Sequence, residues 1–79
     1  MKKDEYQTRD LAEAALLYLQ NLKLLRLVKE DDYVWLVFAD KNKATELSNR
    51  FWQKTVNVDA KSYAETLRFL KDRIFAYIR

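Results

Sequence analysis

The stretch YVWLVFA, Tyr33–Ala39, decides the fold, because its seven consecutive apolar residues are mostly β-branched or aromatic and so favour a β-strand. Side chains of a strand alternate between the two faces of a sheet, which makes both faces of this strand apolar. Such a strand needs cover on both sides. Either helices supply it on both faces, or helices cover one face and a second copy of the chain covers the other.

The residues before this strand predict a helix and the other half of a hairpin. Thr8 is a suitable N-cap for a helix that contains the nearly continuous apolar run over residues 11–19. Asn21 is the residue best suited there to the left-handed conformation that ends many helices. Residues 22–29 then predict a strand rich in Leu and Val, and Glu30-Asp31-Asp32 predicts the turn.

The residues after the strand predict two more helices with a short strand between them. Asp40 and Asp59 are suitable N-caps, and the first of these helices is expected to end near Gln53. Residues 55–58 alternate polar and apolar side chains, which predicts a third strand. At helical spacing, the buried stripe of the last helix is expected to contain Tyr63, Thr66, Leu67, Leu70, Ile74, Tyr77 and Ile78.

The predicted element order is therefore α-β-β-α-β-α, with a three-stranded antiparallel sheet packed by helices, which is an α+β fold. The chain shows no internal repeat and no linker. We expect one domain over residues 1–79, in which the polar residues 1–7 form a frayed tail.

Four residue types are missing from the 79 residues, namely glycine, proline, cysteine and histidine. Without cysteine and histidine the chain can form no disulfide and no zinc-finger or iron–sulfur site, and without glycine it can form no P-loop. A domain this small then relies on a dense core or a partner. No apolar run is long enough to span a bilayer and no signal peptide is expected, so we predict a cytoplasmic bacterial or phage protein with no membrane contact.

The residue types that remain do not predict an enzyme. General acid–base catalysis most often uses histidine, which is absent. Ser48 and Ser62 therefore lack a histidine to activate them, and Glu30-Asp31-Asp32 offers too few oxygen ligands for a hard cation. We predict no catalytic, cofactor-binding or metal-binding residue and no cofactor.

Five short segments stand in a recognisable order, which is Thr8-Arg9-Asp10-Leu11, Val37-Phe38-Ala39-Asp40, Phe51-Trp52, Val58-Asp59 and Leu67-Arg68-Phe69-Leu70-Lys71-Asp72. In this order the chain resembles a family of small bacterial and bacteriophage proteins known as a domain of unknown function. The family pattern has glycine after the first helix and in the hairpin turn, where this chain has Asn21 and Glu30-Asp31-Asp32. The resemblance covers nearly the whole chain and implies a compact domain, but no catalytic residue and no activity.

Charge is uneven along the chain. Residues 1–40 carry a net charge of −2 and residues 41–79 carry +5, which gives the total of +3. On the second and last predicted helices, basic residues recur every seven positions, close to two turns, with aromatic residues nearby. This pattern is typical of a solvated helix face, or of a nucleic-acid-binding surface whose cations contact phosphates. The candidate nucleic-acid-binding residues are Lys43, Arg50, Lys54, Lys61 and Arg68.

The leading hypothesis is a non-enzymatic interaction module that binds itself, as a homodimer, or another protein, and nucleic-acid binding is the alternative. The apolar residues on the first helix and central strand motivate the hypothesis of an interaction module, because large exposed apolar patches mark contact sites. Aromatic residues beside the buried stripe suit either the core or an interface. The candidate interface residues are Leu16, Tyr18, Trp35, Phe69 and Phe75.

Overall fold

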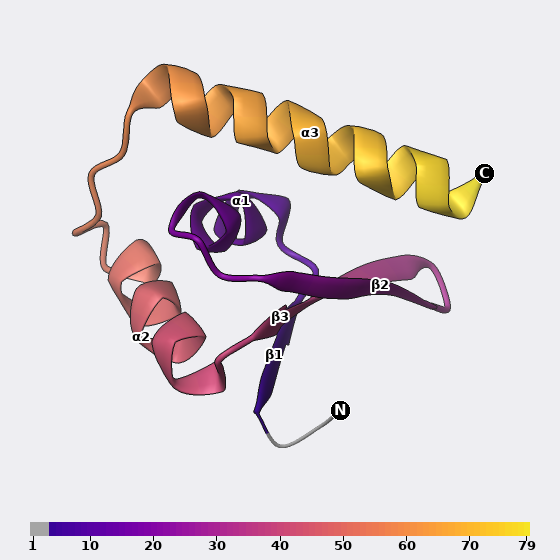
Figure 1. Ribbon diagram of the computed structural model, residues 1–79, viewed down its shortest axis with the longest axis horizontal. Helices are drawn as coiled ribbons and strands as arrows, with labels where there is room; N and C mark the ends of the chain where they lie inside the picture. Colours follow the sequence, from indigo (N-terminus) through magenta and orange to yellow (C-terminus); the bar gives the residue numbers. More distant parts are fainter. Residues whose placement is uncertain (1–3) are drawn as a thin grey trace.

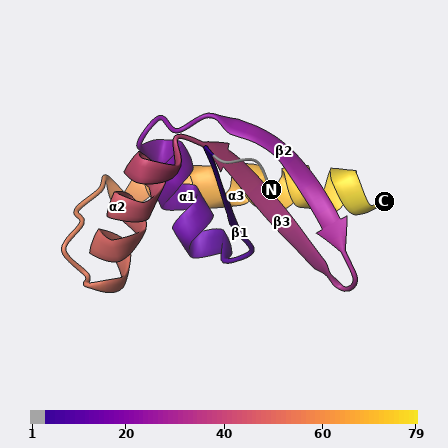
Figure 2. The same ribbon diagram turned by 90° about the horizontal axis from the view of Figure 1, so that it is seen from below.

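The computed structural model describes residues 4–79, in which three helices pack with a three-stranded antiparallel sheet. The elements in chain order are β1 (Glu5–Thr8), α1 (Leu11–Leu19), β2 (Leu24–Glu30), β3 (Tyr33–Ala39), α2 (Lys41–Trp52) and α3 (Ala60–Ile78). Helices α1 and α3 lie over one face of the sheet, and α2 lies beside α1 and β1 (Figure 1). The opposite face of the sheet is covered by no helix of residues 4–79 (Figure 2).

The α+β class and the three-stranded antiparallel sheet are confirmed, but the third strand comes from a different segment. The strand order is β1-β3-β2, with Glu5 opposite Ala39 and Thr8 opposite Leu36. Residues 55–58 form no strand and connect α2 to α3. The expected frayed tail is therefore wrong for residues 5–7, whereas residues 1–3 lie outside the described part of the chain.

β1 completes the sheet because its side chains alternate as a neighbour of β3 requires. Tyr6 packs against the core and Thr8 is buried, while Gln7 between them is exposed. β3 is largely buried, so its backbone N–H and C=O groups need partners on both of its edges. The hairpin with β2 supplies partners on one edge only, and β1 supplies those on the other.

Three aspartates cap the helices. Asp10, Asp40 and Asp59 each accept a hydrogen bond from the backbone N–H three residues later. The predicted caps of the second and last helices are thus confirmed. The predicted cap of the first helix, Thr8, is wrong because this residue belongs to β1, and its hydroxyl accepts a hydrogen bond from the N–H of Asp10.

Helices α1 and α2 end in Schellman motifs, although the chain contains no glycine. Asn21 (φ 71°) and Lys54 (φ 62°) occupy the left-handed position after each helix, so the predicted left-handed conformation of Asn21 is confirmed. The Schellman hydrogen bonds run from the N–H groups of Asn21, Leu22, Lys54 and Thr55 to the carbonyl groups of Tyr18, Leu17, Phe51 and Arg50, respectively.

We expect Lys54→Gly to stabilise the fold. A left-handed backbone costs an L-residue about 1–2 kcal/mol, which glycine avoids because it has no Cβ. After allowance for the greater freedom of glycine in the unfolded chain, the free energy of unfolding should rise by roughly 0.5–1 kcal/mol. The matched control is Lys43→Gly within α2, which should lower it by roughly 0.5–1 kcal/mol. Urea titrations measure both, and equal losses in the two variants would contradict the left-handed assignment.

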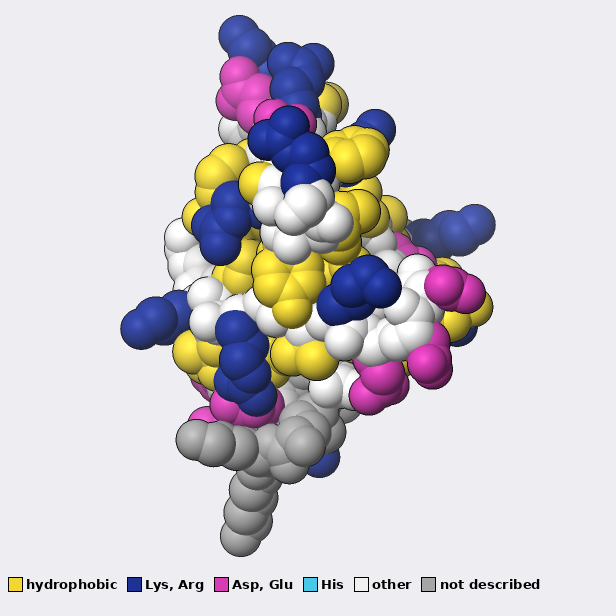
Figure 3. Space-filling view, turned by 90° about the vertical axis from the view of Figure 1, so that its right-hand side faces the viewer, with side chains coloured by type: hydrophobic (Ala, Val, Ile, Leu, Met, Phe, Trp, Pro, Cys, Tyr) yellow, Lys and Arg dark blue, Asp and Glu magenta, His cyan; other side chains and the backbone are white. Residues whose placement is uncertain are grey.

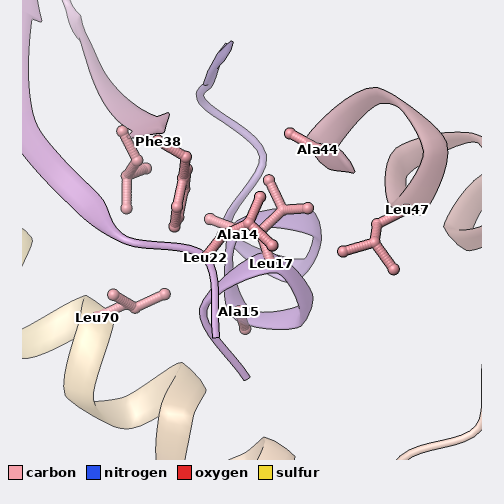
Figure 4. Packing of buried hydrophobic residues seen from close by; sticks show 9 residues of the cluster. Ala14, Ala15, Leu17, Leu22, Phe38, Ala44, Leu47 and Leu70 are labelled. Atoms are coloured by element: carbon pink, nitrogen blue, oxygen red, sulfur yellow. The ribbon is translucent and has the colours of Figure 1, made fainter. Parts of the chain in front are cut away.

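The core is centred on α1, which is buried on several sides, as its apolar run predicts. Ala14 and Leu17 of α1 lie between Phe38 of β3 and Leu47 of α2 (Figure 4). The buried cluster consists of Ala14, Ala15, Leu17, Leu22, Leu36, Phe38, Ala44, Leu47 and Leu70.

Helix α3 packs on this core along one side and is attached near both ends. Leu70 is its buried residue. The hydroxyl of Tyr63 donates to the carbonyl of Ala12 in α1, and the hydroxyl of Tyr77 accepts a hydrogen bond from the N–H of Lys29 in β2. The long helix is therefore held against both α1 and the hairpin.

The predicted buried stripe of α3 is right only in part. Tyr63, Leu67 and Ile74 pack against the core beside Leu70, but Tyr77 and Ile78 are exposed. The reason is that α3 crosses α1, which is seen nearly end-on beneath it (Figure 1). The C-terminal part of α3 therefore continues past α1 towards the hairpin, where Tyr77 reaches Lys29 of β2.

Candidate interaction surface

The outer face of the sheet, for which the sequence predicts cover by helices or a second copy, is covered in part by the chain's own charged side chains. Arg26 of β2 makes two hydrogen bonds, of 3.0 and 2.6 Å, to the carboxylate of Glu5 in β1, and these raise the pKa of Arg26. β3 lies between those two strands, and its outward residue Val37 is 1 % exposed. This part of the sheet therefore needs no second copy to exclude water.

A second arginine covers the aromatic residues of the same face. The guanidinium of Arg9 lies 3.8 Å from the ring centroid of Tyr33 and 5.7 Å from that of Trp35, which is cation–π geometry. The indole N–H of Trp35 is buried and has no hydrogen-bond partner among residues 4–79. The N–H of Trp35 is therefore not accessible to a partner and Arg9 lies near its ring, so the prediction of Trp35 as an interface residue finds no support in this geometry.

The other candidate interface residues divide into three groups. Leu16 is 2 % exposed, so its prediction as an interface residue is wrong, because α1 is enclosed by the rest of the fold. Tyr18 and Phe69 contact each other with ring centroids 5.4 Å apart, and Arg73 lies 5.9 Å from the Phe69 ring. Phe75 is 61 % exposed. Of the five candidates, Phe75 presents the largest exposed fraction of its side chain.

Phe75 belongs to an open groove between the start of α1 and the outward side of α3. The groove has a volume of about 470 Å³ and is lined by Leu11, Ala64, Leu67, Arg68, Lys71, Asp72 and Phe75. Its base is apolar, and its charged residues carry both signs. Where α3 and the hairpin end, hydrophobic side chains lie at the surface among Lys and Arg side chains (Figure 3). We call this groove, which includes Phe75, the α3 outer face.

All five candidate nucleic-acid-binding residues are exposed, but they are spread over three segments of the chain. Lys43 and Arg50 lie at opposite ends of α2, and Lys54 follows that helix. Lys61 and Arg68 lie on α3. Lys54 lines an apolar hollow with Val56 and Val58, whereas Arg68 lines the α3 outer face. The structure therefore does not bring these two cations into one hollow.

A buried polar cluster joins three elements and was not predicted. The carboxylate of Glu13 in α1 is 3 % exposed and accepts hydrogen bonds from the hydroxyls of Tyr6 in β1 (2.9 Å) and Ser48 in α2. The two hydroxyls also lie 3.1 Å apart. The sequence signal is that Glu13 interrupts an apolar helix, but nothing nearby in sequence shows which donors reach it. The cluster fixes α2 and β1 to α1, with Glu13 and Ser48 buried and Tyr6 partly buried.

Tyrosine ionisation should weaken the fold at alkaline pH. Burial is the main cause that raises the pKa of Tyr6 and Tyr63 above the ordinary value of 10.0. The unfolded chain loses these protons near pH 10, before the folded chain does, so their contribution to stability is present below pH 10 and is lost as pH rises through the raised pKa. We expect the free energy of unfolding of Tyr6→Phe/Tyr63→Phe to fall less between pH 9 and 11 than that of the parent chain. Identical pH dependence in urea titrations would contradict this.

No group of three or more acidic, His or Cys side chains within residues 4–79 is placed to hold a metal ion. Every helix in the described part of the chain is too short or too polar to cross a membrane. Comparisons with protein-family models, with curated proteins and with solved structures found no match. The family resemblance of the sequence motifs stays a prediction.

Proposed function

We propose that this chain is a non-enzymatic interaction module that forms a homodimer through the α3 outer face. The observation that carries the proposal is Phe75, whose side chain is 61 % exposed on a helix that packs on the core with its other side. Ile78, about one turn further along, is 44 % exposed and extends the apolar surface. Exposed aromatic side chains beside a groove are typical of protein interfaces.

The size of the domain supports the same proposal. A chain of 79 residues without disulfides has a small core, and association is a common way to bury further apolar surface. Helix α3 has one fully buried residue, Leu70, although it is the longest helix of the described chain. A second copy on the outward side would bury apolar surface that α3 leaves exposed.

Sedimentation velocity over protein concentrations from about 1 to 300 µM tests the proposal, because homodimer dissociation constants near 1 µM are ordinary for modest interfaces. We expect the mass to rise from the 9.5 kDa of one chain to twice that value. Phe75→Ala should stay monomeric at concentrations where the parent chain is dimeric. Trp52→Ala, which truncates an aromatic residue of α2 that is 62 % exposed, is the matched control and should dimerise normally. A parent chain that stays monomeric throughout rules the proposal out.

Nucleic-acid binding is the second candidate, favoured by the exposure of all five basic residues. Its test is the binding of labelled duplex and single-stranded DNA and RNA at two salt concentrations, because affinity from phosphate contacts must fall steeply with salt. Arg50→Ala is the informative variant, since Arg50 lies on α2 away from the α3 outer face. Absence of binding at low salt, or unchanged affinity in Arg50→Ala combined with Arg68→Ala, would end this candidate.

A further inference from the structure

The charges around the α3 outer face indicate how two copies would meet, an inference that rests on the proposed self-association. We infer that the α3 helices of two copies pack antiparallel about a twofold axis level with Leu70. Arg68 of each copy then pairs with Asp72 of the partner subunit, and Phe75 enters the groove of the partner.

The residues that carry this arrangement share one side of α3. Arg68 and Asp72 are one turn apart, and Phe75 follows Arg68 by about two turns. All three line the same groove. Leu70 lies between the two charged residues in sequence and faces the core, so the outward side at its level is open to a second helix.

The antiparallel direction follows from the order of the charges. In an antiparallel pair with its twofold axis level with Leu70, the residue two positions before Leu70 in one copy lies opposite the residue two positions after Leu70 in the other copy. Arg68 and Asp72 occupy those two positions, and the symmetry repeats the ion pair on the other side of the axis. A parallel pair would instead place Arg68 beside Arg68 of the partner subunit, and Asp72 beside its Asp72, which is repulsive.

The same axis gives Phe75 a site. Five positions beyond the axis, Phe75 lies opposite Glu65 of the partner subunit, between its Ala64 and its Arg68, which both line the groove. Ala64 is small, which suits the separation of about 8–10 Å between the axes of packed helices. The guanidinium of Arg68 is then within reach of the entering ring, as in the cation–π contacts that Arg9 makes within one copy.

Charge complementarity favours a second copy over a differently charged partner. The groove carries Arg68, Lys71 and Asp72. An acidic helix would pair with the two cations but would leave Asp72 facing like charge. A second copy brings both signs in the reverse order, so that Arg68 and Asp72 each meet the opposite charge.

Charge exchange tests the arrangement. Arg68→Glu places a carboxylate opposite Asp72 of the partner subunit, and Asp72→Lys places an amine opposite its Arg68. We expect each variant alone to raise the dimer dissociation constant about tenfold or more, because facing like charges are strongly unfavourable at an interface. An equimolar mixture of the two variants should recover heterodimers, since the introduced carboxylate of one chain then meets the introduced amine of the other, and the native Asp72 and Arg68 form the second ion pair. The double variant should also dimerise.

The mixture distinguishes contacts between the two copies from effects within a single helix. Each variant chain has the same sequence alone and in the mixture, so recovered dimerisation can come only from contacts between chains. Lys43→Glu and Glu46→Lys, which make the same charge changes on exposed positions of α2, are the controls and should leave dimerisation unaltered. A dimer that ignores the single charge changes would overturn this inference and leave the proposed function standing. Weakened variants that fail to recover when mixed would overturn the Arg68–Asp72 pairing. A parent chain that is monomeric throughout would overturn both, and would leave the α3 outer face to a different partner.

Discussion

Phe38→Ala is expected to lower the free energy of unfolding by about 3–5 kcal/mol. Phe38 is completely buried near the end of the central strand and belongs to the cluster that joins β3 to all three helices. Truncation removes apolar burial and leaves a cavity that the surrounding side chains fill only in part. Domains of this size have total stabilities on the order of 4–12 kcal/mol, so much of the stability is lost. The melting temperature should fall by more than about 12 °C.

Phe75→Ala removes the same atoms from an exposed position and is the matched control. At concentrations where the chain is monomeric, it should change the free energy of unfolding by less than about 0.5 kcal/mol, as is usual for surface substitutions. Urea denaturation followed by circular dichroism measures both variants. Similar losses in the two would show that Phe75 contributes to the fold of the single chain, which contradicts its exposure of 61 %.

The double variant Tyr6→Phe/Ser48→Ala is expected to lower the free energy of unfolding by about 3 kcal/mol or more. Each substitution removes a hydroxyl that donates to the buried carboxylate of Glu13. Hydrogen bonds to charged groups contribute about 1.5–3 kcal/mol each, and a buried carboxylate without donors is costly in itself. Each single variant should cost less than the double variant.

Adding Glu13→Met to the double variant should restore much of the lost stability. Replacement of every partner by apolar groups of similar volume removes the desolvation penalty along with the hydrogen bonds. The triple variant is therefore expected to unfold at higher urea concentration than the double variant. A triple variant less stable than the double variant would show that the double variant did not leave Glu13 buried without donors.

Local patterns were sufficient to predict the hairpin and most helix ends. The run Tyr33–Ala39 and the acidic turn before it specify β3 and its connection to β2, as the structure confirms. Asp40 and Asp59 cap helices because their side chains accept hydrogen bonds from N–H groups three residues later. Both partners of each bond lie within one short segment, so a local sequence pattern can predict the contact. Asn21 was predictable for the same reason, as the residue best able to replace glycine at a helix end.

Contacts between distant segments explain what the sequence left unpredicted. β1 is a mostly polar segment that becomes a strand because β3 has an open edge, a condition set by tertiary structure. Arg9 and Arg26 look like ordinary surface charges in sequence, yet their side chains lie over the outer face of the sheet. For the same reason, no partner is needed to cover Val37 on the outer side of the apolar strand.

The candidate site was partly predictable. Phe75 stands away from the buried stripe of its helix at helical spacing, and the structure leaves it exposed. Leu16 was predicted wrongly, because a helix that is apolar on most sides gives no sign of which residues face a partner. The groove itself depends on Leu11 of α1 lying beside α3, and helical spacing within α3 alone cannot reveal such a neighbour.

One distance between two copies tests the central claim that the α3 outer faces meet. The chain has no cysteine, so Lys71→Cys carries one spin label per copy, next to the level of the inferred axis. With helix axes about 8–10 Å apart, double electron–electron resonance should give a single label-to-label distance of roughly 20 Å. The dipolar signal at this distance should weaken when the protein is diluted, because the dimer dissociates. Glu46→Cys on α2 should give a clearly longer distance. A longer distance for position 71 than for position 46, or no interaction at several hundred micromolar, would contradict the claim.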